Sequence, residues 1–157
     1  MNVFDKILDQ VKRISRGYNM RHIAEDAAER IKRRTRLGYG VKDGRRSGKR
    51  ERLKETKESY RKARARDKKR GRLSSTTTVK KSNLTRTGQL LASIRGRSSG
   101  TAAIIETKGG RDDGRSNSEV AGYVAENGRP FFELTDKELK GLRNTIKKDL
   151  IKRLRKR

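Results

Sequence analysis

The chain has 157 residues, of which 45 are Lys or Arg and 19 are Asp or Glu, so its formal net charge is +26 at pH 7. Leu, Ile, Val and Phe together make up about 19% of the residues, a share at the border of disordered composition, which excludes a single large hydrophobic core. Self-repulsion at this charge also excludes a compact monomer isolated from polyanions, counterions or acidic protein surfaces, so we expect a partner.

The first 41 residues are predicted to form two helices. The first, within residues 4–14, is amphipathic, with apolar side chains at helical spacing at Phe4, Ile7, Leu8, Val11 and Ile14. Packing on a core or a subunit explains this stripe with the fewest assumptions, and an anionic membrane surface is the alternative.

The second helix is expected to stop before Gly38-Tyr39-Gly40, because the two glycines favour a turn. Its stripe is thin and requires a close neighbour: Ile23, Ala24, Ala27, Ala28 and Ile31.

Residues 42–81 are predicted to be a basic arm or insertion. Residues 42–72 carry 16 basic and 5 acidic groups, with Leu53 and Tyr60 as their sizeable apolar or aromatic side chains. These are too few to offset the entropy of a packed fold, so a helix from about residue 51 to residue 69 needs a partner. The cations suit either nucleic-acid phosphates or acidic protein neighbours, and we leave both open. The candidate contacts are Arg45, Arg46, Lys49, Arg50, Arg61, Lys62, Arg64, Arg66, Lys68, Lys69 and Arg70.

Residues 82–157 are predicted to form a small α+β module. Thr87 is a candidate cap of a short helix that bears Leu90, Leu91 and Ile94. Residues 101–107 have the β-branched content of a strand, and residues 109–114 are typical of a hairpin-like or mobile loop. The expected fold class is therefore α+β, with a small antiparallel sheet packed against N-terminal helices and a long C-terminal helix, plus the extended arm.

Two capping boxes mark helix starts in this module. Ser116 and Glu119 precede an apolar segment at residues 120–124, which favours a short helix while a strand stays open. Thr135 and Glu138 precede the last helix, with its stripe at Leu139, Leu142, Ile146, Leu150 and Leu154.

The residues offer little for catalysis, so we expect no enzyme, cofactor or metal site. The chain has no Cys, and its one histidine, His22, has no nucleophile motif nearby. Asp112-Asp113 lacks the ligand spacing of a calcium loop, and Gly109-Gly110 lacks the ending of a phosphate loop. No apolar run approaches the length of a membrane span, and no signal segment opens the chain, so we expect a soluble, intracellularly made protein without membrane contact.

Three blocks in the C-terminal half follow one another in a characteristic order. They are Leu84-Thr85-Arg86-Thr87-Gly88 with the helix up to Ile94, then Val120-Ala121-Gly122-Tyr123-Val124, then Arg129-Pro130-Phe131-Phe132 before the last helix. Together they resemble the tail-completion or neck family of tailed bacteriophages. Residues 36–41 also resemble the segment before that family's variable insertion.

The resemblance implies a structural virion protein of the head-to-tail junction, made in the bacterial cytoplasm. Several copies, six as a first guess or twelve, would form a homo-oligomeric ring around the DNA channel. The partners would be portal or adaptor proteins and tail-tube or tail-terminator proteins, with nonspecific contact to the DNA backbone as a further option. The alternative function is sequence-nonspecific nucleic-acid binding without a ring.

The family-motif residues make sense as scaffold. Two adjacent aromatics point in different directions, so Phe131 and Phe132 either both fill the core or one anchors a neighbouring subunit. The candidate packing or subunit-interface residues are Leu84, Thr87, Gly88, Leu91, Ile94, Tyr123, Arg129, Pro130, Phe131 and Phe132.

Overall fold

The computed structural model describes residues 18–42, 49–73, 79, 84 and 88–155. Within these residues the chain is α+β, as predicted, with two antiparallel sheets of two strands each and five helices. The predicted helix at residues 4–14 lies outside the described residues. In chain order the elements are α2 (Arg21–Arg36), β1 (Tyr39–Val41), β2 (Arg50–Arg52), α3 (Glu58–Lys69), α4 (Gln89–Ala92), β3 (Ile94–Ser99), β4 (Ala102–Thr107), α5 (Asn117–Glu126) and α6 (Asp136–Arg155).

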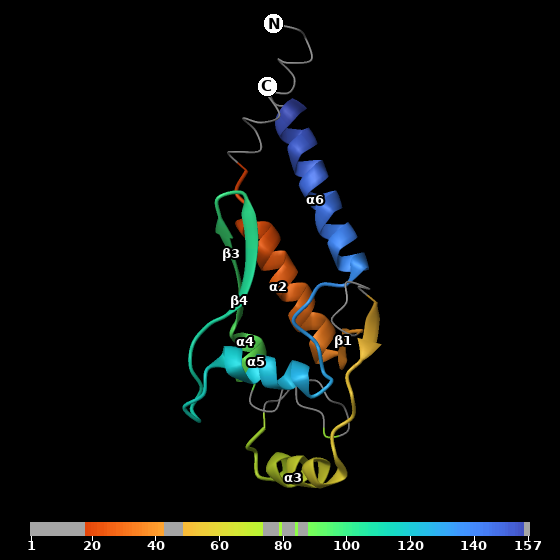
Figure 1. Ribbon diagram of the computed structural model, residues 1–157, viewed down its shortest axis with the longest axis vertical. Coiled ribbons are helices and arrows are strands. Elements are labelled where there is room, and N and C mark those ends of the chain that lie inside the picture. Colours follow the sequence, from red (N-terminus) through yellow and green to blue (C-terminus); the bar gives the residue numbers. More distant parts are fainter. Residues whose placement is uncertain (1–17, 43–48, 74–78, 80–83, 85–87, 156–157) are drawn as a thin grey trace, which may run out of the picture.

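Helix α2 is the central element, with the β3–β4 hairpin on one side of it and α6 on the other (Figure 1). Its predicted stripe is buried, from Ile23 to Ile31, and it ends before Gly38 as expected. The small side chains let the hairpin approach closely. A Cβ added at Gly96 of β3 would lie 2.1 Å from the backbone carbonyl carbon of Ala24.

The hairpin corrects one sequence-based expectation. Strand β4 covers the predicted strand, whereas Ile94, expected in the short helix, begins β3 and pairs with Thr107. The hydroxyl of Ser93 donates to the carbonyl of Leu90, 2.7 Å away, and ends the helix before Ile94. Strand β3 lacks the apolar alternation that marks a strand, because Arg95 and Arg97 are polar and Gly96 faces α2.

The base of the arm is part of the body, which sequence reasoning did not anticipate. Strand β2 pairs antiparallel with β1, from Tyr39 opposite Arg52 to Val41 opposite Arg50. The amide of Leu53 donates to the carbonyl of Gly38, and the Leu53 side chain joins the main core. The burial of Leu53 therefore attaches the base of the arm to the body. The arm helix α3 begins further on, at Glu58.

Two small apolar clusters replace a single large core. The first contains Ala28, Ile31, Leu53, Leu90, Leu91, Ile94 and Phe131. The second lies between α2 and α6 and contains Tyr18, Ile23, Ala27 and Leu142. Ile105 of β4 packs against both clusters and so links them.

Both predicted capping boxes are present. The hydroxyl of Ser116 accepts from the amide of Glu119 at the start of α5, so the segment at residues 120–124 is a helix. At the start of α6, the hydroxyl of Thr135 accepts from the amide of Glu138, and the Glu138 carboxylate accepts from the amide of Thr135. Along α6, Leu142 is buried, whereas Leu139 and Leu154 are exposed.

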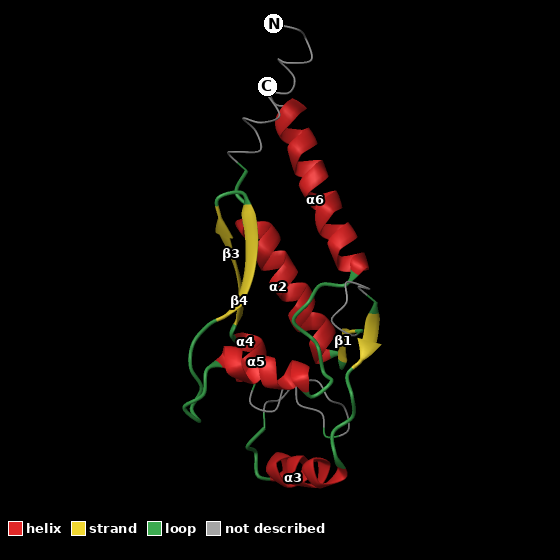
Figure 2. Cartoon of the chain, in the orientation of Figure 1, coloured by secondary structure: helices red, strands yellow, loops and turns green. Residues whose placement is uncertain are grey.

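The elements are arranged along one long axis (Figure 1, Figure 2). Helix α3 lies at one end, apart from the other helices, and the last turns of α6 lie towards the opposite end. Helices α4 and α5 and the β1–β2 sheet lie between α3 and the long part of the body.

The contact between Gly96 and α2 predicts a test of the packing. Gly96→Ala places a methyl group against the Ala24 backbone, which cannot move without shifting the helix, so the free energy of unfolding should fall by about 3 kcal/mol. Gly122→Ala is the control, because no atom outside its own stretch of α5 lies within 4 Å of the position that a Cβ would take there, on the exposed side of the helix. It should raise the free energy of unfolding by about 0.5–1 kcal/mol. Denaturant titration of both variants measures the difference, and equal stabilities would contradict the close packing.

Candidate functional site

The segment Arg129-Pro130-Phe131 connects three parts of the fold. The amide of Val41 donates to the Pro130 carbonyl at 2.9 Å, so this segment lies along β1. The Arg129 guanidinium donates to the backbone carbonyls of Lys54 and Glu55, at 3.2 and 3.4 Å. This family-motif segment therefore joins the base of the arm to the body directly before α6.

The two adjacent aromatics have different surroundings. Phe131 is 0% exposed and belongs to the main core, whereas Phe132 is only partly buried. Their rings meet edge to face with centroids 6.0 Å apart. Of the two side chains, Phe132 is thus the one with surface left for a neighbouring molecule.

A buried arginine ties α2 to the start of α6. Arg34 is 4% exposed, and its guanidinium donates to the carbonyls of Phe131 and Glu133, at 2.7 and 2.6 Å, and to the carboxylate of Glu138. Burial lowers the pKa of Arg34, the charge of Glu138 opposes this effect, and the nearby cation Arg50 adds to it. The Nε of Arg34 has no acceptor among the described residues.

Sequence reasoning missed Arg34, although the pattern held a signal. Arg34 lies three residues after Ile31 on the apolar stripe of α2, a position where a solvated cation is not expected. A charge on the buried face of a helix predicts a buried partner.

A basic pocket opens beside Arg34, with a volume of about 750 Å³. It lies where the last turns of α2, the start of β2 and the first turn of α6 meet. Among the described residues, its lining contains six cations, two acids and two other residues: Arg30, Arg33, Arg34, Lys49, Arg50, Lys137, Asp136, Glu138, Leu37 and Thr135. We refer to it as the basic pocket.

The charges of the basic pocket are only partly compensated. Glu138 is engaged by Arg34, and Arg30 is paired with Asp26 at 2.9 Å. Within the described part of the chain, Arg33, Lys49 and Lys137 form no ion pair. The guanidinium of Arg50 stacks over the Tyr39 ring, 3.6 Å from its centroid, so its contact is with an aromatic face and leaves its positive charge in place.

The predicted arm cations fall into several environments. Arg45 and Arg46 lie outside the described residues, and Lys49 and Arg50 line the basic pocket. Lys62 and Arg61 face Glu58 and Glu55, at 3.2 and 3.7 Å. Arg64 is 2% exposed and so turned away from solvent. The exposed remainder clusters at the C-terminal end of α3, at Arg66, Lys68, Lys69 and Arg70.

The other family-motif residues are mostly scaffold. Gly88 has φ +76° at the start of α4, a conformation that glycine adopts without strain, and Leu91 and Ile94 are buried in the core. Leu84 has φ +52° and packs partly against the same core. Tyr123 is 64% exposed, and Thr87 lies outside the described residues.

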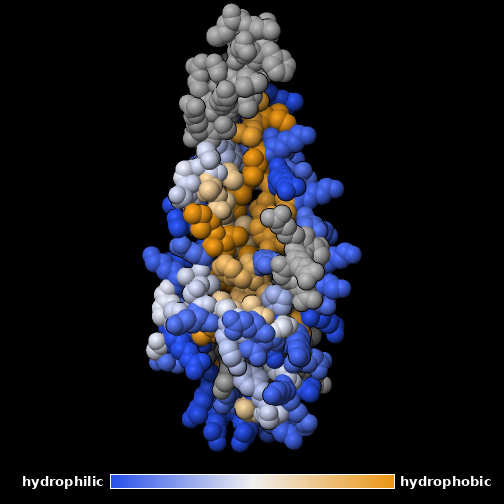
Figure 3. All heavy atoms as spheres, viewed as in Figure 1, coloured by the Kyte–Doolittle hydropathy of each residue, from blue (hydrophilic) through white to orange (hydrophobic). Residues whose placement is uncertain are grey.

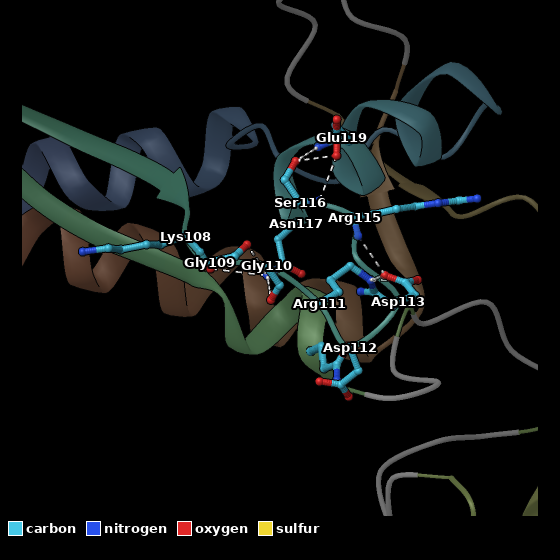
Figure 4. A network of polar contacts seen from close by, with 11 residues as sticks. Lys108, Gly109, Gly110, Arg111, Asp112, Asp113, Arg115, Ser116, Asn117 and Glu119 are labelled. Carbon is cyan, nitrogen blue, oxygen red and sulfur yellow. Dashed lines mark hydrogen bonds and ion pairs between the residues drawn. The ribbon is translucent and has the colours of Figure 1, made fainter.

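The loop between β4 and α5 is built around one buried amide (Figure 4). The side-chain nitrogen of Asn117 donates to the carbonyls of Lys108, Gly109 and Gly110, at 3.3, 3.0 and 3.5 Å. Gly110 also bridges to Ser116. Of the two expectations for this loop, hairpin-like and mobile, the first matches its geometry. Its Asp113 carboxylate accepts from the amide of Arg115, which fits a turn residue.

His22 takes part in a polar cluster at the opposite end of α2 from the pocket. Its Nε2 lies 3.0 Å from a carboxylate oxygen of Asp149 on α6, and the Tyr18 hydroxyl donates to the same oxygen at 2.8 Å. Burial and the bond to Asp149 raise the pKa of Tyr18 to about 12. The hydrogen bonds from Tyr18 and His22 lower the pKa of Asp149. The cluster joins the start of α2 to the later turns of α6.

Among the described residues, no group of three or more His, Asp or Glu side chains is placed to hold a metal ion. No helix in the same part of the chain has the length and apolar character needed to cross a membrane. No protein-family model matches the chain, and comparisons with curated proteins and with solved structures give no match.

The buried pair between Arg34 and Glu138 predicts a large effect of one neutralising substitution. Glu138→Gln keeps a side chain able to complete the capping box but leaves the Arg34 charge buried without a counter-charge, so the free energy of unfolding should fall by about 3 kcal/mol. The matched control is Glu119→Gln in the exposed capping box of α5, which should change the free energy of unfolding far less, because solvent surrounds that carboxylate. Denaturant unfolding compares the two, and similar losses would show that the ion pair contributes nothing beyond the cap.

The lowered pKa of Asp149 predicts an acid-dependent loss of stability. Its carboxylate stabilises the fold at pH values above the ordinary Asp pKa of 3.8, and that contribution is lost as the pH falls through the lower folded value. Asp149→Asn should therefore be less stable than the wild type at neutral pH, with a gap that narrows on acidification. Melting temperatures measured across this range test the effect. The control Glu126→Gln, at an exposed position on α5, should follow the wild-type curve; a constant gap for Asp149→Asn would contradict the linkage.

Proposed function

We propose that the chain is a structural, non-catalytic subunit of the neck of a tailed-phage particle, where several copies form a ring that joins the head to the tail. Six copies are the first choice and twelve the second, around the channel through which DNA passes. The ring contacts portal or adaptor proteins on one side and tail-tube or tail-terminator proteins on the other. The resemblance of the three sequence blocks to the neck family motivates this proposal.

The observation that carries the proposal is a partly exposed apolar surface that the described residues form between the hairpin and α6. Figure 3 shows apolar side chains gathered on this face. On α6, Ile151 and Leu154 are each 38% exposed, and Ile105 of β4, on the side of the hairpin that faces α2, is only partly buried. The β3–β4 sheet has two strands in the described residues, so each strand also has one unpaired edge. A second copy of the chain supplies both apolar surface and backbone partners for this region.

The family-motif geometry supports the same function. A subunit of a ring needs a rigid frame, and the Arg129–Phe131 segment holds the arm base, β1 and the start of α6 together. Tyr123 is 64% exposed and Phe132 is partly exposed, and such aromatic surface suits contacts between subunits.

Sequence-nonspecific nucleic-acid binding without a ring is the second candidate. The exposed cations at the end of α3 favour it, since clustered Lys and Arg side chains bind phosphates without reading bases. The two functions differ in assembly state. The second predicts a monomer that binds DNA tightly, whereas the first predicts a discrete multi-copy ring.

Native mass spectrometry and electron microscopy of the full chain distinguish these functions. We expect a ring of defined copy number for the wild type. Replacing both Ile151 and Leu154 by Ser should weaken the contact between subunits by about tenfold or more, because it removes apolar area from the proposed interface. Leu37→Ser, at an exposed apolar position near β1, is the control and should keep the ring. A wild-type chain that stays monomeric with and without portal and tail proteins would contradict the proposal.

A further inference from the structure

We infer that the basic pocket between α2, β2 and α6 binds the phosphodiester backbone of a nucleic acid, so that the body of the protein, and not only its arm, holds phosphate. The inference rests on the proposed function only for the source of the phosphate, namely the DNA in the channel. That the pocket binds phosphate at all is argued from its charges and its shape alone.

Positive charge is in excess around the pocket. Six of the described residues that line it are cations and two are acids, one of which is already engaged by the buried Arg34. The side chains of Arg33, Lys49 and Lys137 are exposed and have no acidic partner among the described residues. Like charges brought together around one hollow repel each other, and a bound anion removes that repulsion.

The cations are arranged around the hollow on three separate elements. Arg33 comes from α2, Arg50 from the start of β2 with Lys49 directly before it, and Lys137 from α6. Cations from three elements therefore border one hollow, an arrangement that suits the several phosphate groups of a backbone. A ligand with a single carboxylate fits the pocket less well. One guanidinium is enough to bind a planar carboxylate, and such a group would fill only a small part of a pocket of about 750 Å³.

The lining of the pocket contains a single wholly apolar side chain among the described residues. Among the described residues of its lining, Leu37 is the one apolar side chain, and the ring of Tyr39 beside the pocket is covered by Arg50. An acidic protein segment usually adds apolar or aromatic contacts to its charges, and base stacking needs an open aromatic face. The pocket offers Leu37 and the aliphatic stems of its cations but no open aromatic face, so it suits the sugar–phosphate backbone independent of base sequence.

The positive charge continues from the pocket towards the arm. The basic pocket opens beside β2, whose three residues, Arg50, Glu51 and Arg52, are all exposed. Strand β2 leads through Leu53 to the arm helix α3, whose C-terminal end carries further exposed cations. Arg33 and Lys137 belong to the body, so substituting them separates the pocket from the arm in an experiment.

Fluorescence anisotropy with a labelled duplex of about 20 base pairs, titrated over a range of salt concentrations, tests the inference. The pocket variant carries Arg33→Gln and Lys137→Gln. The control variant carries Lys147→Gln and Lys148→Gln, which removes the same charge from exposed positions further along α6. Unlabelled polyglutamate of matched total charge serves as the competitor that mimics an acidic protein. Melting curves check that both variants fold, and Lys49→Gln with Lys137→Gln replaces the pocket variant if Arg33→Gln disturbs α2.

We expect the pocket variant to bind the duplex about tenfold more weakly or worse, with the slope of log affinity against log salt reduced by about two. The control should lose less than about threefold, and polyglutamate should compete poorly. Equal losses of affinity in the two variants would overturn the inference, because they would show that binding depends on the overall charge and not on the pocket. Displacement of the duplex by polyglutamate at equal charge would overturn it in favour of an acidic protein partner. Neither result affects ring formation, which is measured separately by native mass, so the inference and the proposed function fail independently.

Discussion

The fold depends on one buried guanidinium. Arg34 reaches from the apolar side of α2 to two carbonyls before α6 and to the carboxylate that caps α6. The same Glu138 oxygen accepts from Thr135, so the start of the helix, its cap and its contact with α2 are a single hydrogen-bonded unit. Because the chain has few large apolar side chains, this polar junction holds α2 and α6 together, as a larger apolar core does in other proteins. Its position also sets the geometry of the basic pocket, whose walls include the elements that Arg34 joins.

Close backbone approach is the second means by which so polar a chain packs. Ala24 of α2 meets Gly96 of β3, and Gly40 of β1 meets the Pro130 carbonyl, where an added Cβ would lie 2.1 Å away. At both places a missing side chain allows two elements to touch through their backbones. Each contact therefore needs less apolar side-chain area, because dispersion contacts between the two backbones supply part of the packing energy. Because few apolar side chains are needed for packing, many surface positions are occupied by Lys and Arg.

The features that the sequence predicts are those governed by local chemistry. Both capping boxes and the stripe of α2 depend on residues within a few positions of each other, and each correctly indicates a helix. Strand β3 and the pairing of β2 with β1 escape prediction because their residues are mostly Arg, Gly, Ser and Glu, stabilised by partners outside the strand itself. The basic pocket is hidden for the same reason. Sequence patterning assigns Lys49 and Arg50 to an arm, and only tertiary structure brings Arg33 and Lys137 beside them.

Pro130 gives the two sheets of the molecule unequal capacities to grow. Its carbonyl receives the Val41 amide, but a proline has no N–H to return, so hydrogen bonding beyond β1 stops there. On the other side of this sheet, Arg50 and Arg52 place charge on the outer strand, which discourages any further strand. The hairpin of β3 and β4 has no proline in either strand. Of the two sheets in the described residues, the β3–β4 hairpin is therefore the one whose edges carry fewer barriers to an added strand.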